Sequence, residues 1–131
     1  MIRVMIVATY IEVREGLSTL LRLAGGIEVR CAASLSSAVQ QAGETRPDAI
    51  LPDAILVDLE MAQGEGREAL GRLKRLCPSA KIIALTAHDY PAAQQRALQA
   101  GADAVLVKGV AAAEMVEAIR AAAGTHSPSK E

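Results

Sequence analysis

Aromatic residues are almost absent from this sequence. Tyr10 and Tyr90 are the only two, and the chain has no Phe and no Trp. Modules that bind single-stranded nucleic acid stack bases on aromatic side chains, and binding to a phosphate backbone needs an excess of basic residues. The formal net charge of −1 provides no such excess. We therefore expect no direct binding of nucleic acid and a core built from aliphatic side chains.

Cysteines and long apolar runs are also scarce. Cys31 and Cys77 have no metal-ligand spacing and no histidine cluster beside them, so we interpret them as small buried hydrophobic residues in a reducing compartment. The apolar run at the N-terminus is too short for the core of a signal peptide, and no stretch is long enough to span a membrane. The sequence thus predicts a cytoplasmic location and no membrane partner.

Short apolar runs do occur, and they alternate with segments of helical period along the whole chain. The runs are rich in Val, Ile, Leu and Ala and largely lack polar alternation, which is typical of parallel strands buried on both faces. The predicted strands are residues 3–8, 27–32, 54–58, 81–86 and 104–108. Helical stripes lie between them, and Ser34 is a predicted N-cap. This order predicts an α/β fold of three layers, a doubly wound (βα)5 parallel sheet.

The length of 131 residues fits one domain. We predict that the domain spans residues 1–124 and that 125–131 form a flexible tail or the stump of a linker. Ahead of the third strand, the five residues 47–51 are repeated at once as 52–56. Since Pro52 cannot donate to a central ladder, we predict that the second copy forms the strand and that the first lengthens the preceding loop.

Polar residues stand at the predicted ends of three strands. They are Asp58, Thr86 and Lys108, and ligands of open parallel sheets bind beyond the carboxyl ends of the strands. A carboxylate, a hydroxyl and an ammonium group there could supply a nucleophile or metal ligand, a hydrogen-bond partner and a counter-ion for phosphate. A purely structural alternative is a partly buried ion pair between Asp58 and Lys108, kept because removing one partner costs about 3–5 kcal/mol.

Several short motifs carry a family resemblance. They are Val-Arg-Glu-Gly-Leu at 13–17, Ile-Leu-Val-Asp-Leu-Glu-Met at 55–61, Ala-Leu-Thr-Ala at 84–87, Gly-Ala-Asp-Ala at 101–104, and Lys108. Over residues 2–124 the sequence resembles the receiver domain of bacterial two-component response regulators, in particular the subfamily with a helix-turn-helix output domain. The resemblance implies a flavodoxin-like fold with strand order 2-1-3-4-5 and a signalling role without enzymatic activity.

The same resemblance assigns roles and partners. It implies Asp58 as the phosphoacceptor, Thr86 as the switch hydroxyl and Lys108 as the contact to the phosphoryl group. It also implies a histidine kinase or another signalling protein as partner. A homodimer through the face formed by the fourth helix, fifth strand and fifth helix is a further expectation.

The positions after the first strand depart from this family. Receivers normally carry two acidic residues there, whereas this chain has Ala8 and Thr9. In an ordinary receiver a divalent cation neutralises an excess of carboxylates over the lysine, but Asp58 and Lys108 alone leave no excess. Mg²⁺ prefers octahedral oxygen ligands, and only Asp58 and the backbone carbonyl of Glu60 remain to supply them. We therefore predict weak Mg²⁺ binding and slow or absent phosphorylation.

Two further points concern the switch and the metal. The aromatic residue that receivers carry on the fifth strand is replaced by Val105, which cannot report phosphorylation by rotation of a ring. The side chain of Glu60 or Glu65 could substitute for a missing metal ligand, although we expect both to be solvated surface residues.

Three functional hypotheses remain open. The first is an atypical receiver that acts through protein contacts, and the second is a conventional receiver phosphorylated on Asp58 by a histidine kinase. A more distant alternative is a flavodoxin-like, cofactor-binding enzyme. Against it, residues 8–12 contain no glycine that would let backbone N–H groups approach a phosphate closely.

Overall fold

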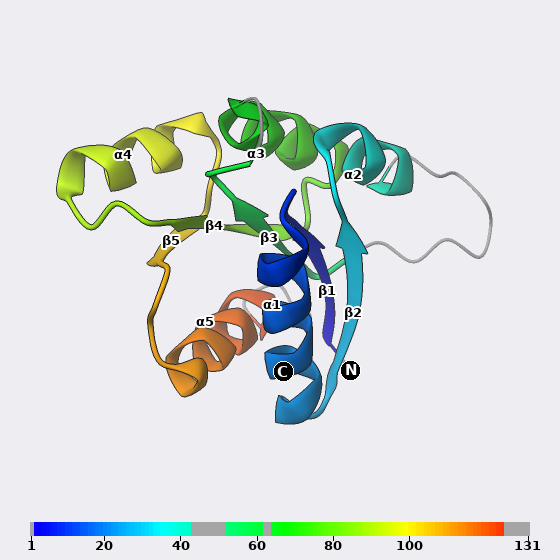
Figure 1. The fold of residues 1–131 in the computed structure, drawn as a ribbon. Helices are drawn as coiled ribbons and strands as arrows, with labels where there is room; N and C mark the ends of the chain where they lie inside the picture. The colour runs from blue at the N-terminus through cyan, green and yellow to red at the C-terminus, as the bar shows by residue number, and fades with distance from the viewer. Residues whose placement is uncertain (1, 43–51, 62–63, 125–131) are drawn as a thin grey trace.

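The computed structural model describes residues 2–42, 52–61 and 64–124. Within them, five parallel strands form one sheet in the order β2-β1-β3-β4-β5. The strands are β1 (Ile2–Val7), β2 (Ile27–Ala32), β3 (Ala54–Asp58), β4 (Lys81–Thr86) and β5 (Ala104–Val107). The helices are α1 (Ile11–Ala24), α2 (Leu35–Ala42), α3 (Glu65–Leu76), α4 (Pro91–Ala100) and α5 (Ala112–Gly124). The predicted three-layer α/β fold and its strand order are confirmed (Figure 1).

The sheet is buried on both faces. Helices α1 and α5 cover one face, and α2, α3 and α4 cover the other (Figure 1). On β3, Ile55 and Val57 pack into the cluster on the α2–α4 side, whereas Ala54 and Leu56 pack into the cluster on the side of α1 and α5. Because side chains of a strand alternate between faces, a strand covered on both sides needs apolar residues at every position. This explains why polar alternation is largely missing from the sequence, whereas the edge strand β2 exposes Glu28 and Arg30 between buried residues.

The second copy of the direct repeat forms β3, as predicted. Asp53 fixes its register against β1, because its backbone N–H donates to the carbonyl of Arg3 at 2.8 Å and its Oδ2 accepts from the Arg3 N–H at 2.8 Å. The first copy, at 47–51, and the predicted tail at 125–131 lie outside the described residues. Ser34 is confirmed as the N-cap of α2, since its Oγ accepts from the N–H of Ser37 at 3.0 Å.

The predicted bounds of two strands were wrong by one residue. β1 covers residues 2–7 instead of 3–8, and β5 ends at Val107 instead of Lys108. The chain turns immediately after β5, where Gly109 has a φ of +98°, a conformation that suits glycine. Lys108 therefore stands in the first turn position after the strand. No described helix is long and apolar enough to cross a membrane.

Candidate functional site

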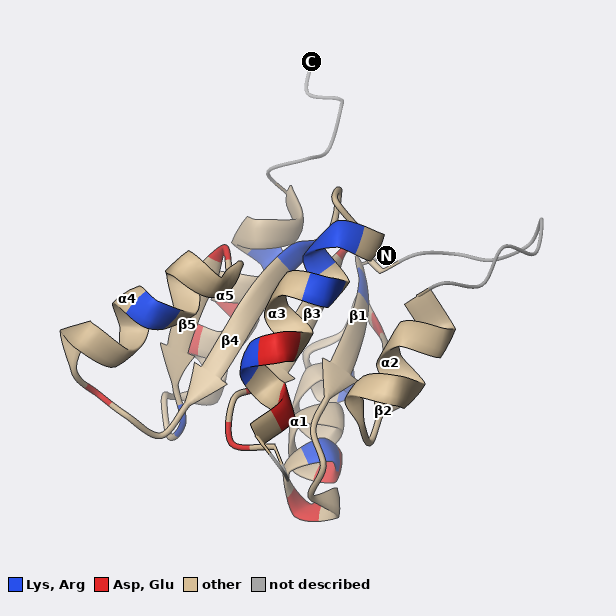
Figure 2. Cartoon of the chain, turned by 90° about the horizontal axis from the view of Figure 1, so that it is seen from above, with Lys and Arg blue, Asp and Glu red and all other residues tan. Residues whose placement is uncertain are grey.

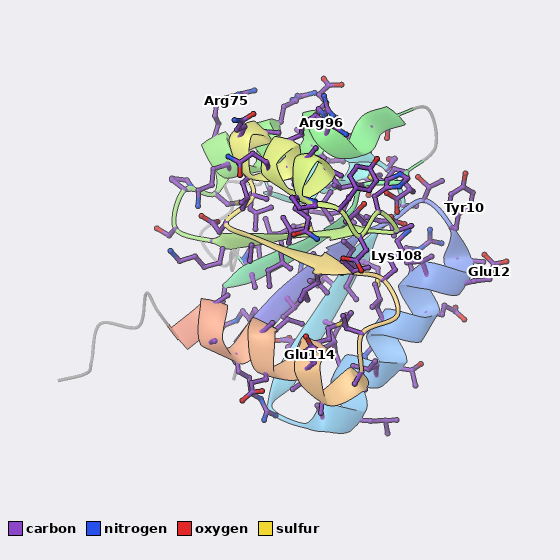
Figure 3. The ribbon with its side chains drawn as sticks, turned by 90° about the vertical axis from the view of Figure 1, so that its left-hand side faces the viewer. Tyr10, Glu12, Arg75, Arg96, Lys108 and Glu114 are labelled. Carbon is purple, nitrogen blue, oxygen red and sulfur yellow. The ribbon has the colours of Figure 1, made fainter. Side chains whose placement is uncertain are left out.

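The polar residues predicted at the strand ends meet at the carboxyl edge of the sheet. Asp58 is the last residue of β3, Thr86 is the last of β4, and Lys108 follows β5. The backbone N–H of Lys108 donates to the Thr86 carbonyl at 2.7 Å, which continues the ladder beyond β5. Lys108 and Tyr10, which precedes α1, lie toward this same end of the sheet (Figure 3). Parallel pairing thus brings together groups that are far apart in the sequence.

Asp58 is the most buried member of the site, with only 1% of its surface exposed. Its Oδ1 lies 2.7 Å from Lys108 Nζ and also accepts from the backbone N–H of Glu60 at 2.9 Å. Its Oδ2 is buried and has no hydrogen-bond partner among the described residues. Buried polar atoms are almost always paired, so this oxygen marks a position where a further group could bind.

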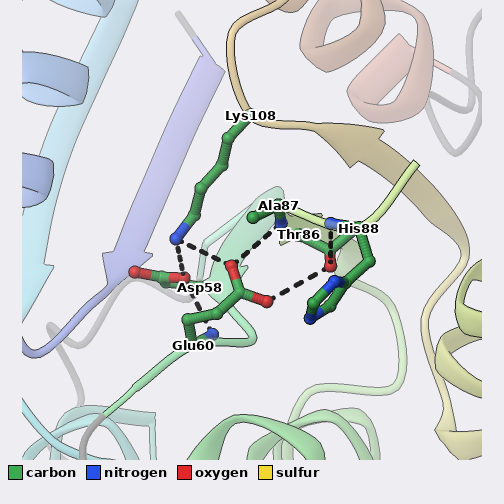
Figure 4. A network of polar contacts seen from close by, with 6 residues as sticks. All are labelled: Asp58, Glu60, Thr86, Ala87, His88 and Lys108. Atoms are coloured by element: carbon green, nitrogen blue, oxygen red, sulfur yellow. Dashed lines mark hydrogen bonds and ion pairs between the residues drawn. The ribbon is translucent and has the colours of Figure 1, made fainter.

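The side chain of Glu60 also belongs to the site, which corrects the expectation that it is solvated and that Asp58 and Lys108 stand alone. Its Oε1 accepts from the N–H of Ala87 at 3.0 Å and lies 2.9 Å from Lys108 Nζ. Its Oε2 accepts from Thr86 Oγ1 at 3.2 Å (Figure 4). The turn after β3, closed by the Glu60 N–H on Asp58 Oδ1, directs the side chain back over the sheet edge. Two carboxylates therefore face one lysine.

The directions in which the pKa values of Glu60 and Lys108 shift agree with this geometry. Burial by itself raises the pKa of Glu60, but the hydrogen bond and charge of Lys108, together with the donors Ala87 and Thr86, outweigh it and lower the pKa below 4.5. Burial by itself lowers the pKa of Lys108, but its bonds to Asp58 and Glu60 and their charges raise it above 10.5. At neutral pH the site therefore holds a charged carboxylate–ammonium network.

The positions of the expected acidic pair carry no carboxylate. Ala8 is fully buried and Thr9 is half-buried after β1. Their backbone carbonyls accept from Nη1 of Arg14, at 3.0 Å and 2.7 Å. A guanidinium group on α1 thus adds positive charge at the place where the family resemblance puts acidic metal ligands.

Few carboxylates are available at this edge as ligands for Mg²⁺. Mg²⁺ is held by carboxylate and carbonyl oxygens in octahedral geometry, and the two carboxylates at this edge, Asp58 and Glu60, are both paired with Lys108. Over residues 2–42, 52–61 and 64–124, no group of three or more His, Cys, Asp or Glu side chains could hold a metal ion. Of the four oxygens of these two carboxylates, only Asp58 Oδ2 has no partner among the described residues.

Val105 and Glu65, two other positions singled out in the sequence, lie away from this network. Val105 on β5 is half-buried and packs against the apolar cluster on the α2–α4 side. Glu65 begins α3, and its Oε1 accepts from the N–H of Leu35 at 3.0 Å. Glu65 thereby satisfies a free N–H donor at the start of α2. It is a contact between two helices, so it does not belong to the site and is not purely solvated.

Comparison with known proteins gives a consistent result. A family model described as the response regulator receiver domain matches residues 4–120. The response regulator GacA of Pseudomonas viridiflava is 36% identical over 121 residues, which are 92% of this chain and 54% of GacA. The response regulator VraR of Staphylococcus aureus is 33% identical over 120 residues, 91% of this chain and 55% of VraR. The crystal structure of a LuxR-family two-component response regulator from Aurantimonas matches with a TM-score of 0.81 at 31% identity, over 94% of this chain and 85% of that one.

The chain spans about half the length of the curated relatives that it matches. The range that the family model matches, residues 4–120, includes the strands that end in Asp58 and Thr86 as well as the turn that carries Lys108. The family model, the relatives and the fold agree. The chain belongs to the receiver domain family of two-component response regulators.

Proposed function

We propose that this chain is an atypical receiver with weakened Mg²⁺ binding, which acts through contacts with other signalling proteins and not as an enzyme. The observation that carries the proposal is the lack of carboxylates at Ala8 and Thr9, whose carbonyls accept from Arg14. A divalent cation would also compete with the ammonium group of Lys108 for Asp58. Phosphoryl transfer needs charge neutralisation at the transferred group, so a weak metal site slows it.

The test is a pair of measurements on the purified chain. We expect calorimetric titration with Mg²⁺ to show no saturable binding in the millimolar range, and acetyl phosphate to add no phosphoryl group by intact mass. A double variant, Ala8→Asp with Thr9→Asp, restores the acidic pair and serves as the matched control, with measurable Mg²⁺ binding expected. Saturable Mg²⁺ binding or prompt phosphorylation of the unmodified chain would contradict the proposal.

One observation favours a second candidate, a conventional receiver phosphorylated on Asp58. The Oδ2 atom of Asp58 is buried without a hydrogen-bond partner among the described residues. In this alternative a carboxylate oxygen of Asp58 forms the new O–P bond while the P–N bond of a kinase phosphohistidine breaks. Asp58→Asn would then change partner affinity and output, whereas the atypical receiver keeps both unchanged.

The partners remain proposals of the same kind. A histidine kinase or another signalling protein is the expected partner. The reason is that the response regulators GacA and VraR match 92% and 91% of this chain. A homodimer through α4, β5 and α5 is proposed by resemblance to the family. The cytoplasmic location also stays a prediction.

A further inference from the structure

The Glu60 carboxylate is bound the way a free oxyanion would be bound. Its two oxygens face three different kinds of donor: the hydroxyl of Thr86, the backbone N–H of Ala87 and the ammonium group of Lys108 (Figure 4). Charge-assisted bonds of this kind are the strong ones, and nothing in these donors is specific for a carboxylate. A phosphate or another oxyanion of similar size presents the same acceptor atoms to them.

The three donors are positioned independently of Glu60. Thr86 Oγ1 accepts from the N–H of His88 at 3.1 Å, and the backbone of Lys108 is bound to the Thr86 carbonyl. Lys108 Nζ is also held at 2.7 Å by Asp58. These contacts belong to β4, the turn after it and the turn after β5, whereas Glu60 reaches in from the turn after β3. The donors would therefore keep their arrangement if the Glu60 carboxylate were removed.

The position that the Glu60 carboxylate occupies is also partly open to solvent. The Glu60 side chain retains about a third of its surface, at 34%. Glu60, Thr86 and His88 belong to the lining of a surface pocket of about 360 Å³, which Arg67 and Arg96 also line. The positive charge of these two arginines favours an approaching anion, so an oxyanion could reach Glu60 and Thr86 from the pocket.

The family resemblance already implies Thr86 and Lys108 as contacts to a phosphoryl group, and these donors together with the Ala87 N–H are called the cradle below. We infer that in this chain the side chain of Glu60 is a tethered occupant of the cradle. Because the carboxylate is attached to the chain, its effective concentration at the cradle exceeds that of a free anion, and it keeps phosphate out. Glu60 thus occupies the cradle while Asp58 is not phosphorylated. This inference deepens the proposed function by adding a second obstacle to phosphorylation, but it does not depend on the metal.

The test is a titration with inorganic phosphate in the presence of a chelator. Binding is monitored through the NMR chemical shift of the Ala87 amide. Inorganic phosphate is expected to bind Glu60→Ala at least about tenfold more tightly than the unmodified chain, because a tethered competitor has been removed. Glu114→Ala is the matched control. Glu114 is an exposed glutamate on α5, outside the network (Figure 3), and its removal should leave phosphate affinity unchanged.

Two further variants separate occupancy from charge and from adventitious binding. Asp58, Glu60 and Lys108 have a summed formal charge of −1, and both Glu60→Ala and Glu60→Gln bring it to zero. Only the glutamine still fills the cradle, so Glu60→Gln should gain clearly less affinity than Glu60→Ala. Glu60→Ala combined with Lys108→Ala should lose the gain. The dispersion of the NMR spectrum shows in each case whether the variant is folded.

Several outcomes would overturn the inference. They are equal phosphate affinity of the unmodified chain and Glu60→Ala, an equal gain in Glu60→Gln, or a gain that survives the loss of Lys108. Loss of Mg²⁺ binding in Glu60→Ala would also overturn it, because Glu60 would then be a metal ligand. Mg²⁺ binding by the unmodified chain that persists in Glu60→Ala would contradict only the weak-metal proposal.

Discussion

At the scale of single residues, two glycines in helices have opposite surroundings. A Cβ at Gly66, near the start of α3, would lie 2.6–2.8 Å from backbone atoms of Leu59, whereas a Cβ at Gly16 in α1 would meet nothing within 4 Å. Gly66→Ala must therefore push the turn after β3 away from α3 and should lower the free energy of unfolding by about 1–3 kcal/mol. Gly16→Ala should instead raise it by roughly 0.5–1 kcal/mol, since alanine favours the helix.

Urea unfolding followed by circular dichroism measures both changes, and Gly16→Ala is the control for the substitution itself. The turn that Gly66 presses against also carries Glu60, so Gly66→Ala should in addition shift the Ala87 amide resonance. If Gly66→Ala unfolds at the same urea concentration as the unmodified chain, the close approach to Leu59 has no energetic consequence.

The sequence located Asp58, Thr86 and Lys108 because strand ends can be read from apolar runs, and parallel strands end at one edge. It did not locate the Glu60 carboxylate, because the direction of a side chain in a loop depends on a turn geometry that the residue types leave open. One signal was present: Glu60 lies only two residues after Asp58, so it had to stand close to the same edge of the sheet. Arg14 was part of a motif, but its bonds to Ala8 and Thr9 required the packing of α1.

At the scale of elements, Asp103 joins three of them. It precedes β5, its Oδ2 accepts from the N–H of Ile82 in β4 at 2.8 Å, and the same oxygen lies 2.9 Å from Lys74 Nζ on α3. Asp103→Asn removes the charge that Lys74 faces and weakens both bonds. We expect a loss of about 1–2 kcal/mol in the free energy of unfolding at neutral pH. Glu68→Gln on α3 is the control, because its pair with Arg72 is exposed and long, at 3.9 Å, and should contribute little.

The pH dependence of this loss has a defined sign. Burial by itself raises the pKa of Asp103, but the bonds from Ile82 and Lys74 and the charges of Lys74 and Lys81 outweigh it and lower the pKa below 3.8. A lowered folded-state pKa gives stability that is fully present above 3.8 and is lost as the pH falls through the folded value. Urea unfolding of the unmodified chain and of Asp103→Asn should therefore show a smaller difference in the free energy of unfolding at about pH 3 than at about pH 7. A difference of constant size would contradict the role of the charge.

Element boundaries show where sequence reasoning reaches its limit. The choice between the two copies of the repeat rested on Pro52, whose missing N–H cannot serve a central strand, and that covalent argument proved correct for β3. The end of β5 was placed one residue too late, because Lys108 continues the backbone pairing with Thr86 although the strand has ended. Propensity cannot resolve such a difference; it depends on the turn at Gly109.

At the scale of the whole molecule, α4 differs from the other helices in what it exposes. Helix α4 buries only Ala97 and carries a single charged residue, Arg96, whereas α3 presents both signs of charge (Figure 2). Beside it, β5 is an edge strand that is half-buried along its whole length. On the opposite layer, α1 exposes Leu23, at 82%. A weakly charged helix next to a sheet edge loses little hydration when covered, which supports α4 and β5 as the contact surface.

The proposed dimer can be tested with two exposed aliphatic residues. Leu98 lies on α4 with 43% of its surface exposed, and Ile11 lies at the start of α1 with 54% exposed. If the chain pairs through α4, β5 and α5, Leu98→Arg places a charge inside the contact and should weaken self-association by at least about tenfold. Ile11→Arg is the matched control, because the pocket that Ile11 lines contains no residue of α4, β5 or α5, and it should leave association unchanged. Sedimentation velocity over a concentration series measures both. Dissociation by Ile11→Arg alone would move the contact to α1, and a monomer at every concentration would exclude the homodimer, because no intermolecular surface would then be occupied.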